Sequence, residues 1–198
     1  MITVALLEKY GGIRKNYKSG DFIFKENSLA LQYFQIISGE VKMNNYNEEG
    51  KEFIQGIFYE NQCFGEPPLF IEQVYPANAV AVTDTELIVI TKNQLLDLLQ
   101  NHSDISLKFI KNLSQRLYYK SVMAAEISSQ DPEHRILRLI DYSIKQLNFK
   151  KEAAGFHIHF TRQQIADLTG LRVETVIRAI KSLEKKGDLK IINRKVYR

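Results

Sequence analysis

Apolar residues recur at helical spacing near the C-terminal end of the chain. Ile165 and Leu168 lie on one side of a short predicted helix. Thr161 and Gln164 have the spacing of a capping box, in which each side chain bonds the backbone N–H of the other residue. Gly170 suits the left-handed residue that ends a helix. The pattern predicts a short helix followed by a tight turn.

A second helix is predicted to begin near Arg172. Its buried stripe consists of four apolar residues at helical spacing, Val173, Val176, Ile180 and Leu183. Its opposite side carries four charged residues, Glu174, Arg178, Lys181 and Lys185. Thr175 and Ile177 lie between them, and a branched apolar residue is unusual on a face that meets only water.

The residue types on this charged face match the chemistry of DNA base edges. An Arg can form two hydrogen bonds with guanine, a Glu can accept one from the cytosine amino group, and an aliphatic side chain can touch the thymine methyl. Two helices joined by a glycine turn, with the second in the major groove, form a helix-turn-helix. The pattern therefore favours DNA binding over an ordinary helical hairpin with a charged outer face.

Residues 14–90 differ, because their apolar stretches are short and separated by glycines. Six strands are predicted, at residues 21–25, 33–38, 40–44, 52–59, 77–83 and 85–90. A polar hairpin loop is expected at 44–50 and a short helical interval at 66–71. Many short strands at near-regular spacing favour a jelly roll. Its core is expected to hold Phe22, Phe24, Phe34, Phe53, Phe58 and Phe64.

Helices are predicted on both sides of this strand region. One covers residues 1–12, and another covers 92–99 with Leu95, Leu96 and Leu99 facing inward.

A long helix is predicted from residue 103 to 127. Its apolar residues fall on or near one seam, Ile110, Leu113, Leu117, Ala124 and Ile127. Such a seam packs either against its own domain or against a second copy of the helix. We favour the dimer, because a helix-turn-helix normally binds paired half-sites as a two-fold symmetric dimer.

The remaining elements frame the two-helix motif. Asp131 is expected to cap a helix that has Pro132 at its first position, and this helix continues over 134–147. A strand at 156–160 precedes the motif, and a basic hairpin at 189–198 follows it as a wing.

Composition and charge sharpen this picture. With 198 residues, 44% hydrophobic and 25% charged, the chain has the profile of a soluble protein of one large or two small domains. Residues 1–130 hold 12 Lys and Arg against 15 Asp and Glu, a balance of −3. Residues 131–198 hold 15 against 8, a balance of +7. Positive charge is concentrated where the helix-turn-helix is predicted, as a nucleic-acid-binding domain requires.

Several classes of protein are disfavoured. No apolar run approaches the length needed to span a bilayer, and the first residues lack the features of a signal peptide, so we expect no membrane contact. The single cysteine, Cys63, excludes an internal disulfide and four-cysteine iron–sulfur ligation, and it fits a reducing cytoplasm. Residues 14–90 contain no histidine, so a metal-dependent jelly-roll oxygenase lacks its ligands, and we expect no enzyme.

The chain resembles the Crp/Fnr family of bacterial transcription regulators over nearly its whole length. The resemblance lies in SGEVK and FGEPPLF in the strand region, the long helix, TRQQIADLTGLRVETVIRAIKSLEKKG and the wing. It implies an α+β fold with a cyclic-nucleotide-binding-like β-roll sensor at 1–102, a connecting and dimerisation helix at 103–130, and a winged helix-turn-helix at 131–198. It also implies a homodimer on a pseudo-palindromic operator of double-stranded DNA, contacting RNA polymerase if it is an activator.

The family pattern assigns roles to particular residues. Glu174 and Arg178 match the pair that meets a G·C base pair, and Val173 and Ile177 match positions that tune the other bases. Ile177 departs from the Ser that is typical of the Fnr-like branch. The residues that match or are expected at backbone contacts are Arg162, Gln163, Arg172, Thr175, Lys181, Lys185 and Lys190.

The same comparison argues against a cyclic nucleotide as the effector. The effector pocket would include Gly65, Glu66, Tyr75 and Asn78. In nucleotide-binding relatives a short helix presents backbone N–H groups to the phosphate and an Arg follows it. Here two prolines, at 67 and 68, remove donors, and no Lys or Arg occurs between residues 52 and 91. A phosphate there would lack a cationic partner.

Other effectors remain open, and we expect no cofactor and no metal. His157 and His159 alternate on one strand and could hold a metal, but two ligands are fewer than such sites need. Cys63 is more simply a core residue, and nothing marks His102 or His134 as a haem ligand. The alternative function is a protein-interaction or small-ligand-binding module whose helix-turn-helix does not bind DNA.

Overall fold

The computed structural model describes residues 2–129, 131–146 and 151–198, without the side chains of 127–129 and 146. The chain divides into two compact units, Met1–Leu113 and Ser114–Arg198. The boundary falls within the longest described helix, α4 (Ser103–Ser129). The α+β fold that we predicted, with an N-terminal β-roll, a long helix and a C-terminal helix-turn-helix, is confirmed.

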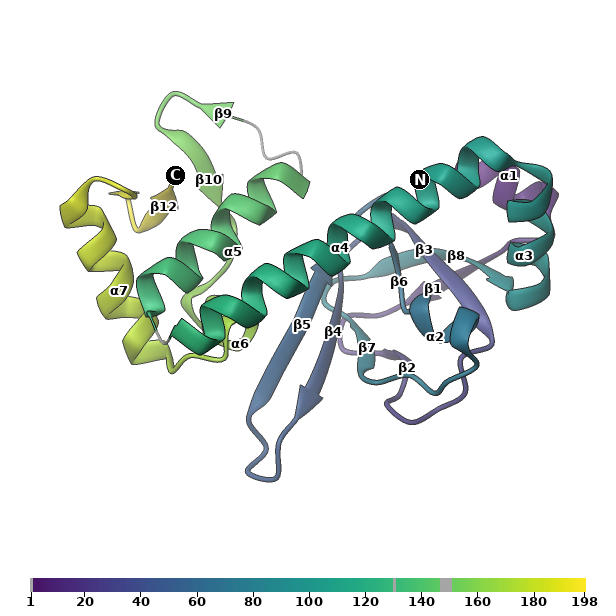
Figure 1. The fold of residues 1–198 in the computed structure, drawn as a ribbon, viewed down its shortest axis with the longest axis horizontal. Coiled ribbons are helices and arrows are strands. Elements are labelled where there is room, and N and C mark those ends of the chain that lie inside the picture. Colours follow the sequence, from purple (N-terminus) through teal and green to yellow (C-terminus); the bar gives the residue numbers. More distant parts are fainter. Residues whose placement is uncertain (1, 130, 147–150) are drawn as a thin grey trace. The chain divides into compact units, whose positions relative to one another are not determined.

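The N-terminal unit is a roll of two four-stranded antiparallel sheets (Figure 1). One sheet has the order β1-β8-β3-β6, with the strands Ile13–Tyr17, Thr85–Thr91, Gln32–Ser38 and Cys63–Phe64. The other has the order β2-β7-β4-β5, with Phe22–Phe24, Asn78–Ala81, Val41–Tyr46 and Glu52–Phe58. In Figure 1, β4 and β5 extend as a long hairpin beyond the other strands of this unit.

Three short helices complete the unit, α1 (Val4–Lys9), α2 (Pro67–Ile71) and α3 (Lys92–Asn101). Helices α1 and α3 pack beside β8 at one end of the roll (Figure 1). The N-terminus of α3 is fixed by a capping box between Thr91 and Gln94.

The core of the roll is aromatic, but it contains fewer phenylalanines than we predicted. Phe24, Phe34 and Phe64 are buried, and Phe58 packs against them half-buried. The prediction was wrong for Phe22 and Phe53, whose exposed fractions are 47% and 42%.

Local backbone geometry explains these two errors. The register of β2 against β7 shifts between Phe22 and Phe24, so residues two apart do not share a face there. On β5 the neighbouring Ile54 takes the inward position, which leaves Phe53 on the opposite face.

Other differences are small. The six predicted strands exist with ends shifted by up to two residues, whereas β1 and β6 were missed because neither shows an alternating apolar pattern of useful length. In α3, Leu95 and Leu98 are the buried residues, and Leu96, predicted to face inward, is only half-buried.

The C-terminal unit combines the second part of α4 with three further helices, α5 (Pro132–Gln146), α6 (Arg162–Thr169) and α7 (Val173–Lys186). A four-stranded antiparallel sheet has the order β11-β12-β10-β9, with Lys190–Ile192, Lys195–Tyr197, Gly155–Ile158 and Lys151–Glu152. The helix predicted to reach residue 147 ends its described part at 146. A core of its own holds this unit together, including Ile136, Ile140, Ile165, Val176, Ile180, Leu183 and Val196.

Helix α4 leaves much of its predicted seam uncovered in a single chain. Ile110 and Leu117 are 57% and 67% exposed, and Ala124 is exposed too. Leu113 packs half-buried against the core of the roll, and the side chain of Ile127 lies outside the described residues. Within the described part of the chain, no helix is both long and apolar enough to cross a membrane.

Candidate nucleic-acid interface

Helix α6 begins and ends as its sequence predicts. The side chain of Thr161 accepts a hydrogen bond from the backbone N–H of Gln164 at 3.0 Å, and the backbone N–H of Thr161 donates to Oε1 of Gln164 at 2.9 Å. Gly170 ends the helix with φ +70°, a value that only glycine adopts without strain. The chain therefore turns sharply between α6 and α7.

Helix α7 has one buried face and one exposed face. Val176, Ile180 and Leu183 are at most 1% exposed, and Ala179 joins them at 6%. Val173, the first residue of the helix, is half-buried rather than fully buried. Packing of this stripe fixes the rotation of α7, and therefore fixes which residues face solvent.

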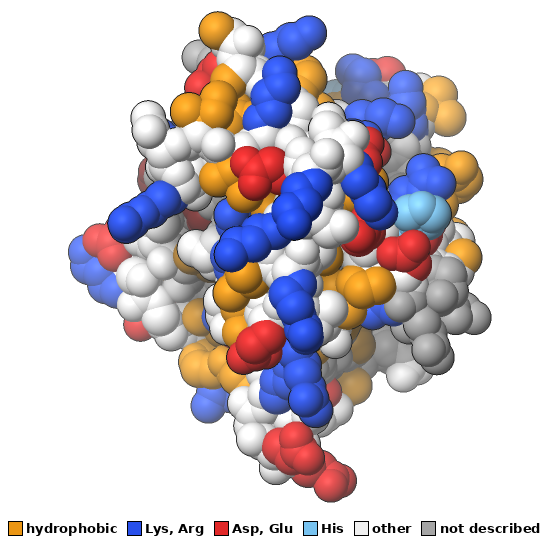
Figure 2. Space-filling model, turned by 90° about the vertical axis from the view of Figure 1, so that its left-hand side faces the viewer, with side chains coloured by type: hydrophobic (Ala, Val, Ile, Leu, Met, Phe, Trp, Pro, Cys, Tyr) orange, Lys and Arg blue, Asp and Glu red, His pale blue; other side chains and the backbone are white. Residues whose placement is uncertain are grey.

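The exposed face carries the residues that we predicted to contact DNA bases. Glu174 and Arg178 are exposed, and Ile177 keeps 41% of its surface exposed although it is branched and apolar. Lys181 and Lys185 continue the same face. Figure 2 looks at the side where α7 lies in Figure 1, and it shows Lys and Arg side chains gathered in a band with a few acidic side chains beside it.

The residues predicted at the DNA backbone flank this face. Gln163 is exposed, and its amide donates to Oδ1 of Asp167 at 2.9 Å. Arg162 is half-buried, and desolvation lowers the pKa of its guanidinium. Thr175 is half-buried, and exposed positions are held by Arg172 before α7 and by Lys190 in the wing.

Polar contacts cap helix α5 and join it to α6. The Asp131 carboxylate accepts from the backbone N–H of Glu133 at 2.8 Å and of His134 at 3.3 Å, and so caps α5 as predicted. The buried Arg135 donates to the carbonyl of Thr169, the last residue of α6, at 3.1 Å. This contact satisfies a carbonyl at the end of the first helix of the motif.

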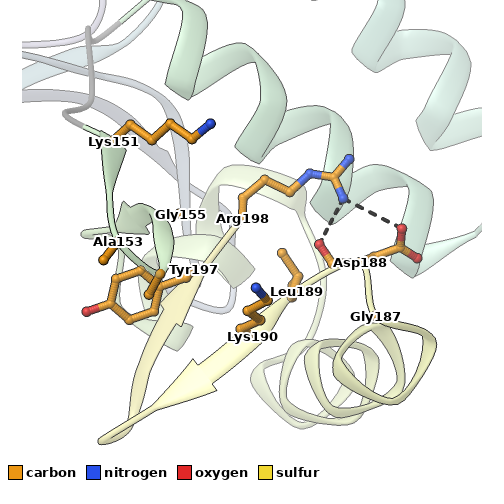
Figure 3. A pocket seen from close by; sticks show the side chains of 10 residues that line it. Lys151, Ala153, Gly155, Gly187, Asp188, Leu189, Lys190, Tyr197 and Arg198 are labelled. Carbon is orange, nitrogen blue, oxygen red and sulfur yellow. Dashed lines mark hydrogen bonds and ion pairs between the residues drawn. The ribbon is translucent and has the colours of Figure 1, made fainter.

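The wing is joined to the rest of the unit through Arg198. Its guanidinium pairs with Asp141 of α5 at 2.9 Å. It also donates to the carbonyl of Asp188 at 2.8 Å (Figure 3). The hollow of about 240 Å³ beside it is also lined by Lys151, Lys190 and Tyr197. Because Arg198 also pairs with the Asp188 carboxylate at 3.6 Å, we assign it a structural role in placing the wing next to the end of α7.

A second hollow, of about 370 Å³, lies between α5 and α7. It is lined by Asp131, Pro132, Glu133, Thr175, Arg178, Ala179, Ser182 and Lys186. Glu133 and Lys186 form an ion pair across it at 2.5 Å. We did not predict either residue at the interface, although the spacing of four residues between Arg178, Ser182 and Lys186 places all three in one row of the helix.

The two histidines of the β10 region, His157 and His159, lie side by side. Their rings lie 4.3 Å apart, and His157 also contacts Tyr197 with 5.2 Å between centroids. Burial lowers the pKa of His157, and the charge of the nearby His159 lowers it further. No group of three or more potential metal ligands occurs among the described residues.

The residues predicted to form an effector pocket instead contact other residues of the roll. Tyr75 is 2% exposed and stacks on Phe24, with 3.7 Å between ring centroids and 9° between planes. Its hydroxyl donates to the carbonyl of Gln32 at 3.3 Å, and burial raises its pKa to about 12. A Cβ atom at Gly65 would lie 2.7 Å from the Phe24 ring.

The two polar members of the predicted pocket are engaged as well. Glu66 is fully buried and accepts a hydrogen bond from the thiol of Cys63 at 3.4 Å. Asn78 accepts from the backbone N–H of Glu26 at 3.0 Å and donates to the carbonyl of Asn44 at 3.2 Å. Helix α2 begins with two prolines, so its first two positions offer no backbone donor.

Comparison with known proteins agrees with this architecture. Residues 14–102 match the cyclic nucleotide-binding domain, and residues 134–197 match the Crp-like helix-turn-helix domain. The cAMP-activated global transcriptional regulator CRP of Haemophilus influenzae is 31% identical over 160 residues, which are 80% of this chain and 70% of that protein. The chain belongs to the Crp/Fnr family.

Further relatives extend over most of the chain. The regulator CRP of Salmonella typhimurium is 29% identical over 169 residues, 85% of this chain and 80% of that protein. The solved structure of the c-di-GMP responsive regulator CLP of Xanthomonas campestris has the same fold, with a TM-score of 0.74, 24% identity and 98% of each chain covered. The family makes this chain a DNA-binding transcription regulator with an effector-sensing domain.

Proposed function

We propose that the protein acts as a homodimer on a pseudo-palindromic operator, with one α7 per subunit in each of two successive major grooves about 34 Å apart. The observation that carries this proposal is the outer face of α7. Glu174, Ile177 and Arg178 are exposed there, opposite a stripe that is almost fully buried. The sensor would cover residues 1–102, the connecting helix 103–130 and the DNA-binding domain 131–198.

The base contacts follow from side-chain chemistry. Arg178 would bond O6 and N7 of a guanine, and Glu174, one turn earlier, would accept from the amino group of a cytosine. Val173 and Ile177 would touch thymine methyl groups or other apolar base edges. Because Ile177 offers no hydrogen bond, we expect the half-site to differ from the sites of relatives that have Ser at this place.

The backbone contacts surround those bases. Arg162, Gln163, Arg172 and Thr175 lie at the start of the two helices, and Lys181, Lys185 and Lys190 add positive charge along α7 and the wing. Such contacts position the protein but carry no sequence information.

The dimer contact would be the seam of α4. Four large apolar side chains of this helix, Leu107, Ile110, Leu117 and Tyr118, are 57–73% exposed in the single chain. Their burial by a second copy would remove apolar surface from water, at about 25 cal/mol per Å².

The signal sensed by the roll would not be a cyclic nucleotide. The stack of Tyr75 on Phe24 and the absence of any Lys or Arg from residue 52 to 91 both disfavour a buried phosphate. The names of the curated relatives describe cAMP activation of those proteins, and this chain would respond to a different signal. It would work in the cytoplasm and, as an activator, would contact RNA polymerase.

A gel shift on mixed genomic DNA fragments tests the proposal against its alternative. We expect a shift at 50 mM salt that weakens steeply as salt increases, because phosphate contacts release counterions. The control is a variant with Arg162, Lys181 and Lys185 all changed to Gln. No shift of the wild-type protein at low salt would favour a protein-interaction module instead.

A further inference from the structure

Two charged residues at the edge of the proposed DNA-binding face bind each other. Nζ of Lys186, in the last turn of α7, lies 2.5 Å from Oε2 of Glu133, in the first turn of α5. Ser182, one turn before Lys186, lines the same hollow, and its hydroxyl helps to lower the pKa of the Glu133 carboxyl. The Glu133 side chain is 22% exposed, and that of Lys186 is 59% exposed. The carboxylate is thus held in place, whereas the lysine is open to solvent.

This pair lies beside residues that would touch DNA. Glu133 and Lys186 line the same hollow as Thr175, a proposed backbone contact, and Arg178, a proposed base contact. A DNA strand that passes this edge of α7 would therefore come within reach of Lys186.

Other carboxylates surround Lys186. Asp131 lines the same hollow, and Asp188 follows the end of α7. The hydrogen bond and charge of Glu133, and then the charges of Asp131 and Asp188, raise the pKa of Lys186. Lys186 and Ser182 lower the pKa of Glu133, so both members of the pair are charged at neutral pH.

Lys185, the residue next to Lys186, has different surroundings. It is exposed on the face that carries Glu174, Arg178 and Lys181, and no ion pair of Lys185 occurs in the part of the chain that the structure describes. The two adjacent lysines therefore differ in whether a carboxylate already holds them.

We infer that Glu133 withholds Lys186 from the DNA backbone, so that Lys185 binds a phosphate in the complex and Lys186 does not. A phosphate at Lys186 would have to compete with the Glu133 carboxylate for the lysine's charge and would also approach Asp131, which is negative. Glu133 therefore restrains the affinity for every DNA sequence, and its removal frees one additional cation per subunit. This inference rests on the proposed function and assigns a role to a residue outside the helix-turn-helix.

The salt dependence of DNA binding tests the inference. The full-length protein is titrated into a labelled DNA duplex between 50 and 200 mM KCl, and the slope of log K against log salt is compared among variants. Each phosphate contact contributes about 0.9 to the slope, or about threefold in affinity over this range. We expect Lys185→Gln to reduce the slope by about 0.9 per subunit and Lys186→Gln to leave it unchanged.

The Glu133 variants provide the second half of the test. Glu133→Gln should increase the slope by about 0.9 per subunit, and the double variant with Lys186→Gln should return it to the wild-type value. An equal loss from Lys185→Gln and Lys186→Gln would overturn the inference, and so would an increase that persists in the double variant. If Glu133→Gln does not fold, the comparison of the two lysines decides alone. Failure of the wild-type protein to bind any DNA would instead refute the proposed function.

Discussion

A glycine with the same left-handed φ angle occurs in each unit of the protein, in opposite surroundings. Gly65 in the roll and Gly170 in the helix-turn-helix both have φ +70°. A Cβ atom at Gly65 would lie 2.7 Å from the ring of Phe24, whereas a Cβ atom at Gly170 would meet nothing within 4 Å. The backbone at Gly65 is thus crowded by Phe24, whereas the turn at Gly170 is open.

This contrast extends to the neighbouring side chains. In the roll, three phenylalanines pack against one another and Tyr75 stacks on one of them, Phe24. The ring centroids of these pairs are 3.7–6.0 Å apart. In the helix-turn-helix, charged residues of α7 stand in solvent above a packed stripe. This chain thus combines a roll whose aromatic residues pack in its own core with a helix-turn-helix whose charged groups are exposed to solvent.

Truncation of the stacked aromatic pair should have the largest effect. We expect Phe24→Ala to reduce the free energy of unfolding of the roll by about 3–5 kcal/mol, because it removes a buried ring and leaves a cavity. Phe22→Ala is the matched control on the same strand, since Phe22 is 47% exposed, and it should cost less than about 1 kcal/mol. Urea unfolding followed by circular dichroism measures both, and equal losses would mean that the stack does not close the roll.

The two glycines give a direct comparison of crowding. Gly170→Ala should cost about 1–2 kcal/mol, the strain of an L-residue in the left-handed region. Gly65→Ala should cost about 1–3 kcal/mol more, because its methyl group also meets the Phe24 ring. Thermal unfolding of both variants tests this order. A Gly65 variant no less stable than the Gly170 variant would contradict the tight packing described here.

On the DNA-binding side, a single arginine should control sequence preference. Arg178→Ala should weaken operator binding by about 1–3 kcal/mol and relax the preference at one G·C pair. Lys185→Ala, the control, should weaken binding to all sequences alike. Fluorescence anisotropy with a set of single-base operator variants measures the difference. A uniform loss from Arg178→Ala would contradict its role as a base contact.

The cap of α5 makes the DNA-binding unit sensitive to acid. Backbone hydrogen bonds, from His134 first and also from Glu133, lower the pKa of Asp131. The cap therefore stabilises the unit above the ordinary pKa range of Asp, and this contribution is lost as pH falls through the lowered pKa. Asp131→Ala should cost about 1 kcal/mol at neutral pH and less in acid, whereas Asp131→Asn should keep most of the cap at both. The free energy of unfolding of each variant, measured at pH 7 and pH 3, tests this expectation. A stability loss from Asp131→Ala that is the same at both pH values would contradict it.

Cyclic AMP should have the smallest effect. We expect 1 mM cyclic AMP to leave the melting temperature of the protein and its operator affinity unchanged. A ligand present at 100 times its dissociation constant would stabilise the protein by about 2.7 kcal/mol, which differential scanning fluorimetry detects easily. The cAMP-activated regulator of Haemophilus influenzae is the positive control. A clear shift for this chain would show that the Phe24–Tyr75 stack can open.

Local patterns were sufficient to predict the helix-turn-helix. The capping box at Thr161, the left-handed Gly170 and the buried stripe of α7 are properties of neighbouring residues, and the structure has all three. The exposure of Glu174 and Arg178 follows from the same helical periodicity.

Features that depend on distant partners could not be predicted. Strand β1 forms because Ile13–Tyr17 pairs with β8, more than sixty residues away, and its own pattern gives no sign of this. The exposure of Phe22 depends on a register shift against β7. Similarly, the ion pair of Glu133 with Lys186 joins residues of two helices, and no sequence spacing identifies it.

Selection of bound DNA from a random pool tests the central claim most directly. The account predicts enrichment of two inverted half-sites about one helical turn apart, each with a G·C pair whose enrichment disappears in Arg178→Ala. A pool that stays random, or that yields a preferred sequence unaffected by loss of Arg178, would contradict the assignment of the α7 outer face as the surface that recognises DNA.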